Sequence, residues 1–220
     1  MAGSLNSRPT IMVSSTVYGV EELLERIYAV LTGFGYEVWS SHMGTMPTTS
    51  TLNAFDNCIQ AVRNCDIFLG LITPRYGSGL APGEISITHK ELITAIELNK
   101  PRWLLAHHNV VFARSLLRQL GHGTAEARAE LAFKESNVID DLRVVDMYDA
   151  AIRNEIIFRE RTGNWVQKFV SEEDALRYAT AQFYRFQEVE SLLQEHLAGP
   201  RAVMNRIEAD ATNARRQGDG

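Results

Sequence analysis

The sequence predicts an α/β protein built on a parallel β-sheet with helices on both faces. The 220 residues are 45% hydrophobic and 22% charged, which is ordinary for a globular protein. Along the first half of the chain, short and continuously apolar runs alternate with segments of helical period. Continuous apolar runs are typical of strands that are buried on both faces, and a helix between successive strands favours parallel pairing.

A domain with four strands and three helices is expected over residues 10–106. The strands are expected at residues 10–14, 36–40, 66–73 and 102–106, and the helices at 20–33, 52–63 and 88–99. Asp66 begins the third strand at the amino end of the sheet, so we expect it to be structural. Residues 1–9 are expected to be a flexible N-terminus.

A mainly helical extension, packed on this domain, is expected over residues 107–198. Helical periodicity covers residues 110–120, 124–134 and 171–197. Residues 142–147 fit a strand or the start of a helix, and 165–169 fit a short strand. The last helix opens with the pattern of a capping box from Ser171 to Asp174. Its apolar and aromatic stripe suits packing on the sheet or on a partner chain. Residues 199–220 are polar, and we expect a disordered tail there.

Net charge, cysteine content and the lack of long apolar runs restrict the expected cellular compartment and the expected classes of partner. The net charge is −5, which argues against nucleic acid or an anionic membrane as a partner. The only two cysteines, Cys58 and Cys65, form neither a zinc pattern nor a disulfide framework, so a reducing compartment is expected. No run approaches the ~18 apolar residues of a membrane span, and no signal peptide is evident. We therefore expect a soluble, cytoplasmic protein with no metal site.

Hydroxyl and aromatic residues follow the first two strands, where parallel sheets bind ligands. Ser14, Ser15 and Thr16 could hold a phosphate or a ribose, and Tyr18 could line the same pocket. Alternatively, Ser15 or Thr16 caps the following helix, and spacing alone leaves both interpretations open. Trp39 ends the second strand at the same edge.

The loop after the third strand is rich in glycine. Gly77, Ser78 and Gly79 would let the backbone approach a ligand, Tyr76 offers a ring for stacking, and Arg75 offers a charge. The alternative is an ordinary flexible loop.

A carboxylate opens the third helix. Glu91 could face the anomeric carbon of a bound nucleoside, as a nucleophile or as a group that stabilises an oxocarbenium-like transition state. Alternatively, Thr88 and Glu91 have the spacing of a capping box, and spacing alone favours this structural role.

Four segments resemble a prokaryotic family of domains of unknown function with a TIR-like, flavodoxin-like fold. They are MVSSTVYG, GYEVWSSHMGT, NCDIFLGLITPRYGSG and SITHKELITAIELNKPRWLL, all within residues 10–106. DDLRVVDMYDAA and GNWVQKF resemble the extension of a small subgroup of that family. Gly19, Leu23 and Leu24 stand where many members carry charged residues, which puts in doubt any function that depends on those charges.

The third helix is more distantly similar to the active-site segment of nucleoside 2-deoxyribosyltransferases. The spacing of Glu91, Ala95, Lys100 and Pro101 matches that of the family's nucleophilic Glu, an Ala and a Lys-Pro pair. This similarity implies a catalytic Glu91. The same fold group contains TIR enzymes that cleave NAD and TIR modules that only assemble, and fold analogy does not choose between them.

We therefore expect a nucleotide-binding N-glycosidase that acts on NAD or a related nucleotide and requires no cofactor. The resemblance alone implies a role in phage defence. The alternative is a non-catalytic, nucleotide-sensing or self-assembling interaction module. A homo-oligomer and an operon-encoded protein partner are also expected.

Overall fold

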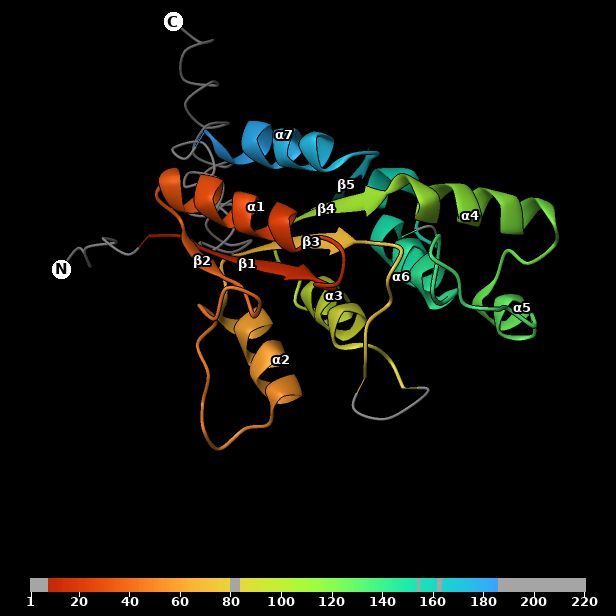
Figure 1. The fold of residues 1–220 in the computed structure, drawn as a ribbon, viewed down its shortest axis with the longest axis horizontal. Helices are drawn as coiled ribbons and strands as arrows, with labels where there is room; N and C mark the ends of the chain where they lie inside the picture. The colour runs from red at the N-terminus through yellow and green to blue at the C-terminus, as the bar shows by residue number, and fades with distance from the viewer. Residues whose placement is uncertain (1–7, 80–83, 154, 162–163, 186–220) are drawn as a thin grey trace, which may run out of the picture.

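The computed structural model describes residues 8–79, 84–153, 155–161 and 164–185 (Figure 1). Five parallel strands form one sheet in the order β2-β1-β3-β4-β5. Their bounds are Thr10–Ser15 for β1, Glu37–Trp39 for β2, Ile67–Ile72 for β3, Arg102–His107 for β4 and Asn164–Phe169 for β5. The expected α/β fold, a parallel sheet flanked by helices, is confirmed.

Helices cover both faces of the sheet (Figure 1). One face carries α1 (Glu21–Gly33) and α7 (Glu172–Phe183), and the other carries α2 (Ala54–Asn64), α3 (Ile87–Glu97) and α6 (Arg143–Ile152). Helices α4 (His108–Gln119) and α5 (Ala125–Ala129) extend beyond β4, and a 3₁₀ turn spans Phe158–Glu160.

Strand alternation divides the apolar core into two layers. Ile11 and Val13 of β1 pack with α1 and α7, whereas Met12 packs with the helices on the opposite face. Both layers are buried, as continuous apolar strands predict.

The segment after residue 106 contributes a strand to the sheet as well as helices. The expected strand at 165–169 is β5, which pairs in parallel with β4, and residues 142–147 belong to α6 rather than to a strand. The helix expected at 124–134 is wrong in length, because α5 ends at Ala129. There the Leu131 amide bonds back to the carbonyl of Arg128 in a tighter turn.

The expected cap of the last helix is present. Ser171 Oγ accepts a hydrogen bond from the Asp174 amide at 3.3 Å, and Asp174 Oδ2 accepts one from the Val170 amide. The apolar stripe of α7 packs on this chain's own sheet, with Phe183 fully buried. The rest of that expected helix, from residue 186 onward, and the expected tail at 199–220 lie outside the described residues.

Two further residues stabilise the amino edge of the sheet. Asp66 Oδ2 accepts hydrogen bonds from the amide and the hydroxyl of Thr10, both at 2.8 Å, which agrees with its expected structural role. Lys100 Nζ donates to the carbonyls of Arg63 and Cys65, at the C-terminal end of α2. In the described part of the chain, no helix combines the length and the apolar character needed to cross a membrane.

Candidate active site

A buried carboxyl and a serine hydroxyl meet where β1 runs beside α3. Ser14 Oγ donates a hydrogen bond of 2.5 Å to Glu91 Oε2. Glu91 is 5% exposed and Ser14 is 3% exposed. Removing a carboxyl from water is costly unless donors replace its hydration, so this hydroxyl stabilises the carboxyl in its position.

The alternation of β1 decides which hydroxyl reaches Glu91. Met12 faces the helices α2 and α3, whereas Ile11 and Val13 face α1. Ser14 therefore points toward α3, and Ser15 belongs to the opposite face. The Ser15 hydroxyl donates to the carbonyl of Thr16 instead. The three neighbouring hydroxyls thus do not form one cluster.

Glu91 does not cap its helix. The N-cap of α3 is Ser86, whose Oγ accepts a hydrogen bond from the His89 amide at 3.3 Å. Thr88 is therefore in the first turn, and Glu91 is in the second turn, where it bonds to Ser14. The capping box that spacing favoured for Thr88 and Glu91 is wrong, because the true N-cap precedes Thr88 by two residues.

Burial sets the proton affinity of this carboxyl. It raises the pKa of Glu91 to about 7, and the hydrogen bonds from Ser14 and from the Cys58 thiol oppose this rise. Burial, together with the nearby Glu91, raises the pKa of Cys58 to about 12, so the thiol stays protonated and can donate. A carboxyl with a pKa near 7 is populated in both protonation states at neutral pH, a property common at catalytic sites.

This raised pKa predicts that the protein loses stability as the pH rises. Between pH 4.5 and about 7 the unfolded chain ionises at Glu91 while the folded chain keeps the proton, so folding becomes less favourable. Above pH 7 the total loss of unfolding free energy caused by the raised pKa of Glu91 amounts to about 3 kcal/mol. Glu91→Gln removes it, and urea unfolding should show a gain of about 1–3 kcal/mol at pH 8 that is absent at pH 4. The exposed Glu97→Gln is the control; equal gains at both pH values would contradict the prediction.

The glycine loop lies against the end of β1. Gly77 has φ +79°, and a Cβ at this residue would lie 3.0 Å from Thr16 Oγ1. The carbonyl of Ser78 accepts a hydrogen bond of 3.0 Å from the Ile87 amide. A Cβ on Gly79 would lie 2.5 Å from the carbonyl oxygen of Ile85. The loop is therefore packed closely between β1 and the start of α3.

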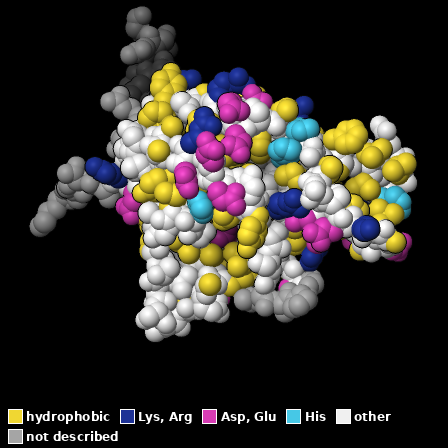
Figure 2. Space-filling view, in the orientation of Figure 1, with side chains coloured by type: hydrophobic (Ala, Val, Ile, Leu, Met, Phe, Trp, Pro, Cys, Tyr) yellow, Lys and Arg dark blue, Asp and Glu magenta, His cyan; other side chains and the backbone are white. Residues whose placement is uncertain are grey.

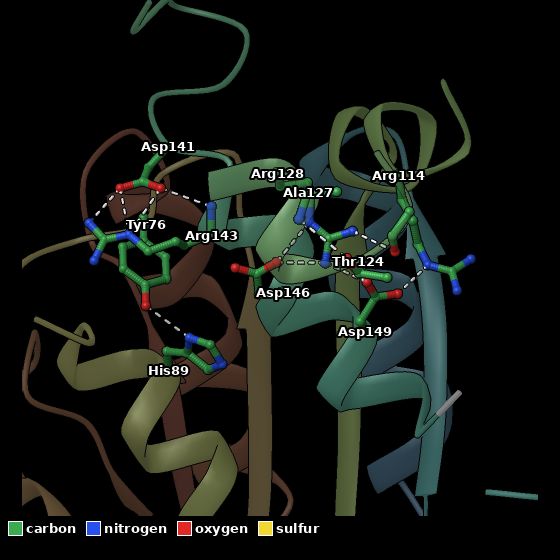
Figure 3. Close-up of polar contacts among 11 residues, drawn as sticks. Tyr76, His89, Arg114, Thr124, Ala127, Arg128, Asp141, Arg143, Asp146 and Asp149 are labelled. Atoms are coloured by element: carbon green, nitrogen blue, oxygen red, sulfur yellow. Dashed lines mark hydrogen bonds and ion pairs between the residues drawn. The ribbon is translucent and has the colours of Figure 1, made fainter. Parts of the chain in front are cut away.

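Tyr76 is buried beneath an arginine (Figure 3). The Arg143 guanidinium carbon lies 4.4 Å from the centre of the Tyr76 ring, and the Tyr76 hydroxyl shares a hydrogen bond of 2.9 Å with His89 Nδ1. Burial, with a smaller effect of Arg143, lowers the pKa of His89 to about 4, so this imidazole is neutral at pH 7. Because Arg143 stacks on the ring, Tyr76 positions the loop in this structure instead of offering a free stacking surface.

The remaining expected site residues differ in burial and in their hydrogen bonds. Tyr18 follows β1 and is 75% exposed. Trp39 is half-buried, and its indole nitrogen donates to Glu37 Oε1 at 2.8 Å. Ala95 is buried in the core, and Lys100 lies at the amino edge. Of the residues in the transferase-like spacing, Ala95 lies one turn beyond Glu91 on α3, whereas Lys100 lies at the amino edge of the sheet.

The residues that sequence reasoning missed come from distant segments. Cys58 contacts Glu91 from α2, and Arg143 contacts Tyr76 from α6. Local patterns carry no signal for either pairing. Within the ranges that the structure describes, no three His, Cys, Asp or Glu side chains are grouped to hold a metal ion.

Comparison with known proteins assigns a family. A family model described as "Domain of unknown function (DUF4062)" matches residues 10–198. No curated protein matches the chain. Among solved structures, the chain is similar to the CMP N-glycosidase BcmB of Clostridium botulinum, with 13% identity over 79% of this chain and 98% of that chain, and a TM-score of 0.39. The match to the family model covers most of the sequence, so this chain belongs to the DUF4062 family.

Proposed function

We propose that this protein is a nucleotide N-glycosidase in which Glu91 acts on C1′ of the sugar. The Glu91–Ser14 pair carries the proposal, because it places a buried carboxyl with a raised pKa near the carboxyl edge of a parallel sheet. The capping role that competed with catalysis is absent from α3.

The proposed reaction has two steps. A Glu91 carboxylate oxygen forms a bond to C1′ while the N-glycosidic bond breaks. The base leaves with the electron pair of that bond: nicotinamide leaves as a neutral molecule from its cationic form, whereas a base that leaves as an anion takes a proton from water. A water molecule then attacks C1′ and gives up a proton to the solvent, which releases the sugar and restores the carboxylate. Ser14 holds Oε2 and so fixes the orientation of the carboxylate for attack.

NAD or a related nucleotide is the substrate class that we propose, with no cofactor. The hydroxyl of Thr16 and the backbone of Gly77 lie together at the end of β1, where backbone and hydroxyl groups suit a ribose or a phosphate. We extend the proposal to a role in phage defence with an operon-encoded partner.

A substrate panel tests this activity. Purified protein is incubated with NAD, NADP, nucleosides and deoxynucleotides, and released base is separated by chromatography. The expected result is release from at least one nucleotide by the native chain and by the exposed-site control Glu97→Gln, but not by Glu91→Gln. Release from none of these compounds would contradict the proposal.

The pH dependence of the rate provides a second test. Because the ionised carboxylate is the nucleophile, kcat/KM should rise about tenfold per pH unit below pH 7 and level off above it. A rate that falls as the pH rises through 7 would mean that Glu91 acts as an acid instead.

An exposed apolar stripe favours self-assembly as a second candidate function. Phe112, Leu116 and Leu120 follow one another at intervals of four residues along and just beyond α4, and they are 67%, 43% and 63% exposed. Figure 2 shows hydrophobic side chains gathered over this end of the molecule. Such a stripe can pair with itself across a twofold axis. Light scattering should then show a dimer that Leu116→Asp disrupts, and a strict monomer at high concentration would contradict it.

A further inference from the structure

The loop between β3 and α3 is held by residues of the segment after residue 106. The Tyr76 amide donates to Asp140 Oδ1 at 2.9 Å, and the Asp140 amide donates to the carbonyl of Pro74 at 3.2 Å. These two reciprocal hydrogen bonds join residue 140 to the stem of the loop that leaves β3.

Arg143 connects both stems of the same loop. Its guanidinium stacks on the ring of Tyr76 in the first stem, and its Nη1 donates to the carbonyl of Glu84 in the second stem at 2.9 Å. A single side chain at the start of α6 thus fixes the two described ends of the loop relative to each other.

Asp141 in turn fixes Arg143 (Figure 3). Its Oδ1 accepts a hydrogen bond from Arg143 Nε at 3.1 Å and its Oδ2 accepts one from Nη2 at 2.6 Å, a bidentate arrangement that sets the plane of the guanidinium. Its Oδ1 also accepts from the Arg143 amide at 2.8 Å. Asp141 therefore holds Arg143 in the orientation in which it stacks on Tyr76.

Tyr76 connects Arg143 to the candidate site through its hydroxyl and through the next residue in the chain. The hydroxyl of Tyr76 bonds to His89, which belongs to the same helix as Glu91. The next residue, Gly77, lies against Thr16 at the end of β1. A shift of Tyr76 would therefore move the adjacent Gly77 relative to Thr16.

We propose that Arg143, oriented by Asp141, is the positioning residue that holds the Tyr76–Gly79 segment in its ligand-binding conformation. The nucleotide bound by this segment follows from the proposed function, whereas the contacts by which Arg143 holds the segment do not depend on it. Arg143 acts through Tyr76 on ligand capture, so its loss should weaken substrate binding and leave the chemical step at Glu91 intact.

Two readouts on Arg143→Ala and Arg143→Met test the inference, with Arg118→Ala of α4 as the exposed control. In native-state hydrogen exchange, the amides of Tyr76 and Ile87 should exchange at least about tenfold faster, while amides of β4 stay unchanged. For the substrate found in the panel, KM should rise about tenfold while kcat stays within about threefold.

The outcomes separate this inference from the proposed function. Unchanged exchange at both amides would overturn the positioning role, whether or not the native protein releases base. Faster exchange in a protein that cleaves no nucleotide would support the positioning role and refute the glycosidase. A lower kcat at unchanged KM would overturn the assignment to ligand capture.

Discussion

Replacing Glu91 with Gln should reduce base release by at least about 10³-fold, because the amide cannot attack C1′. Gln preserves the shape of the side chain, and its carbonyl oxygen can still accept the hydrogen bond that Ser14 donates at 2.5 Å to Glu91. The variant should therefore fold and bind its nucleotide. Initial rates, measured by chromatography of released base, give the size of the loss.

The control separates lost chemistry from lost folding. Glu97→Gln changes an exposed carboxylate on the same helix and should keep the native rate. Binding of the substrate to Glu91→Gln, measured by calorimetry, should stay within a few-fold of the native affinity. Base release by Glu91→Gln at the native rate would rule out Glu91 as the nucleophile.

Replacing Arg128 with Met should cost about 3–5 kcal/mol of unfolding free energy at pH 7, because it removes a buried guanidinium, leaves the half-buried Asp146 without its arginine and leaves Asp149 only Arg114. The Arg128 side chain is only 3% exposed. It bonds to Asp146 at 2.6 Å and to Asp149 at 2.8 Å (Figure 3). Its Nη1 donates to the carbonyl of Gly123. Urea unfolding measures the loss.

The pH dependence identifies the cause of that loss. Burial already raises the pKa of Asp146, and removing the arginine raises it further, so the Asp146 carboxyl can take up a proton in the folded state at low pH. The cost should therefore shrink toward pH 4. Arg177→Met breaks an exposed ion pair with Asp174 and should cost at most about 1 kcal/mol. A cost for Arg128→Met below about 1 kcal/mol at pH 7 would contradict this role.

The central strands were predictable from sequence because a strand that is buried on both faces requires apolar residues at successive positions. Residues 67–72 of β3 are all buried, and the sequence there is apolar throughout. The edge strand β5 lacks this signal, since Trp165 is 62% exposed. The start of α6 was equally ambiguous, because its N-cap, Leu142, makes no side-chain capping bond.

The candidate site was predictable only in part. The position of Glu91 on a helix beside the strand edge followed from spacing, but its capping role did not hold, because Ser86 rather than Thr88 is the N-cap. Cys58 is 33 residues from Glu91 in the sequence and Arg143 is 67 residues from Tyr76, and only the packing of α2 and α6 around α3 brings each pair together. Contacts of this kind leave no trace in local periodicity.

Mass spectrometry of acid-quenched enzyme tests the central claim most directly. The native chain, mixed with the nucleotide that it cleaves and quenched during turnover, should carry a covalent sugar on the peptide that contains Glu91, and Glu91→Gln should carry none. A sugar on a different residue, or turnover by Glu91→Gln at the native rate, would contradict nucleophilic attack by this carboxylate.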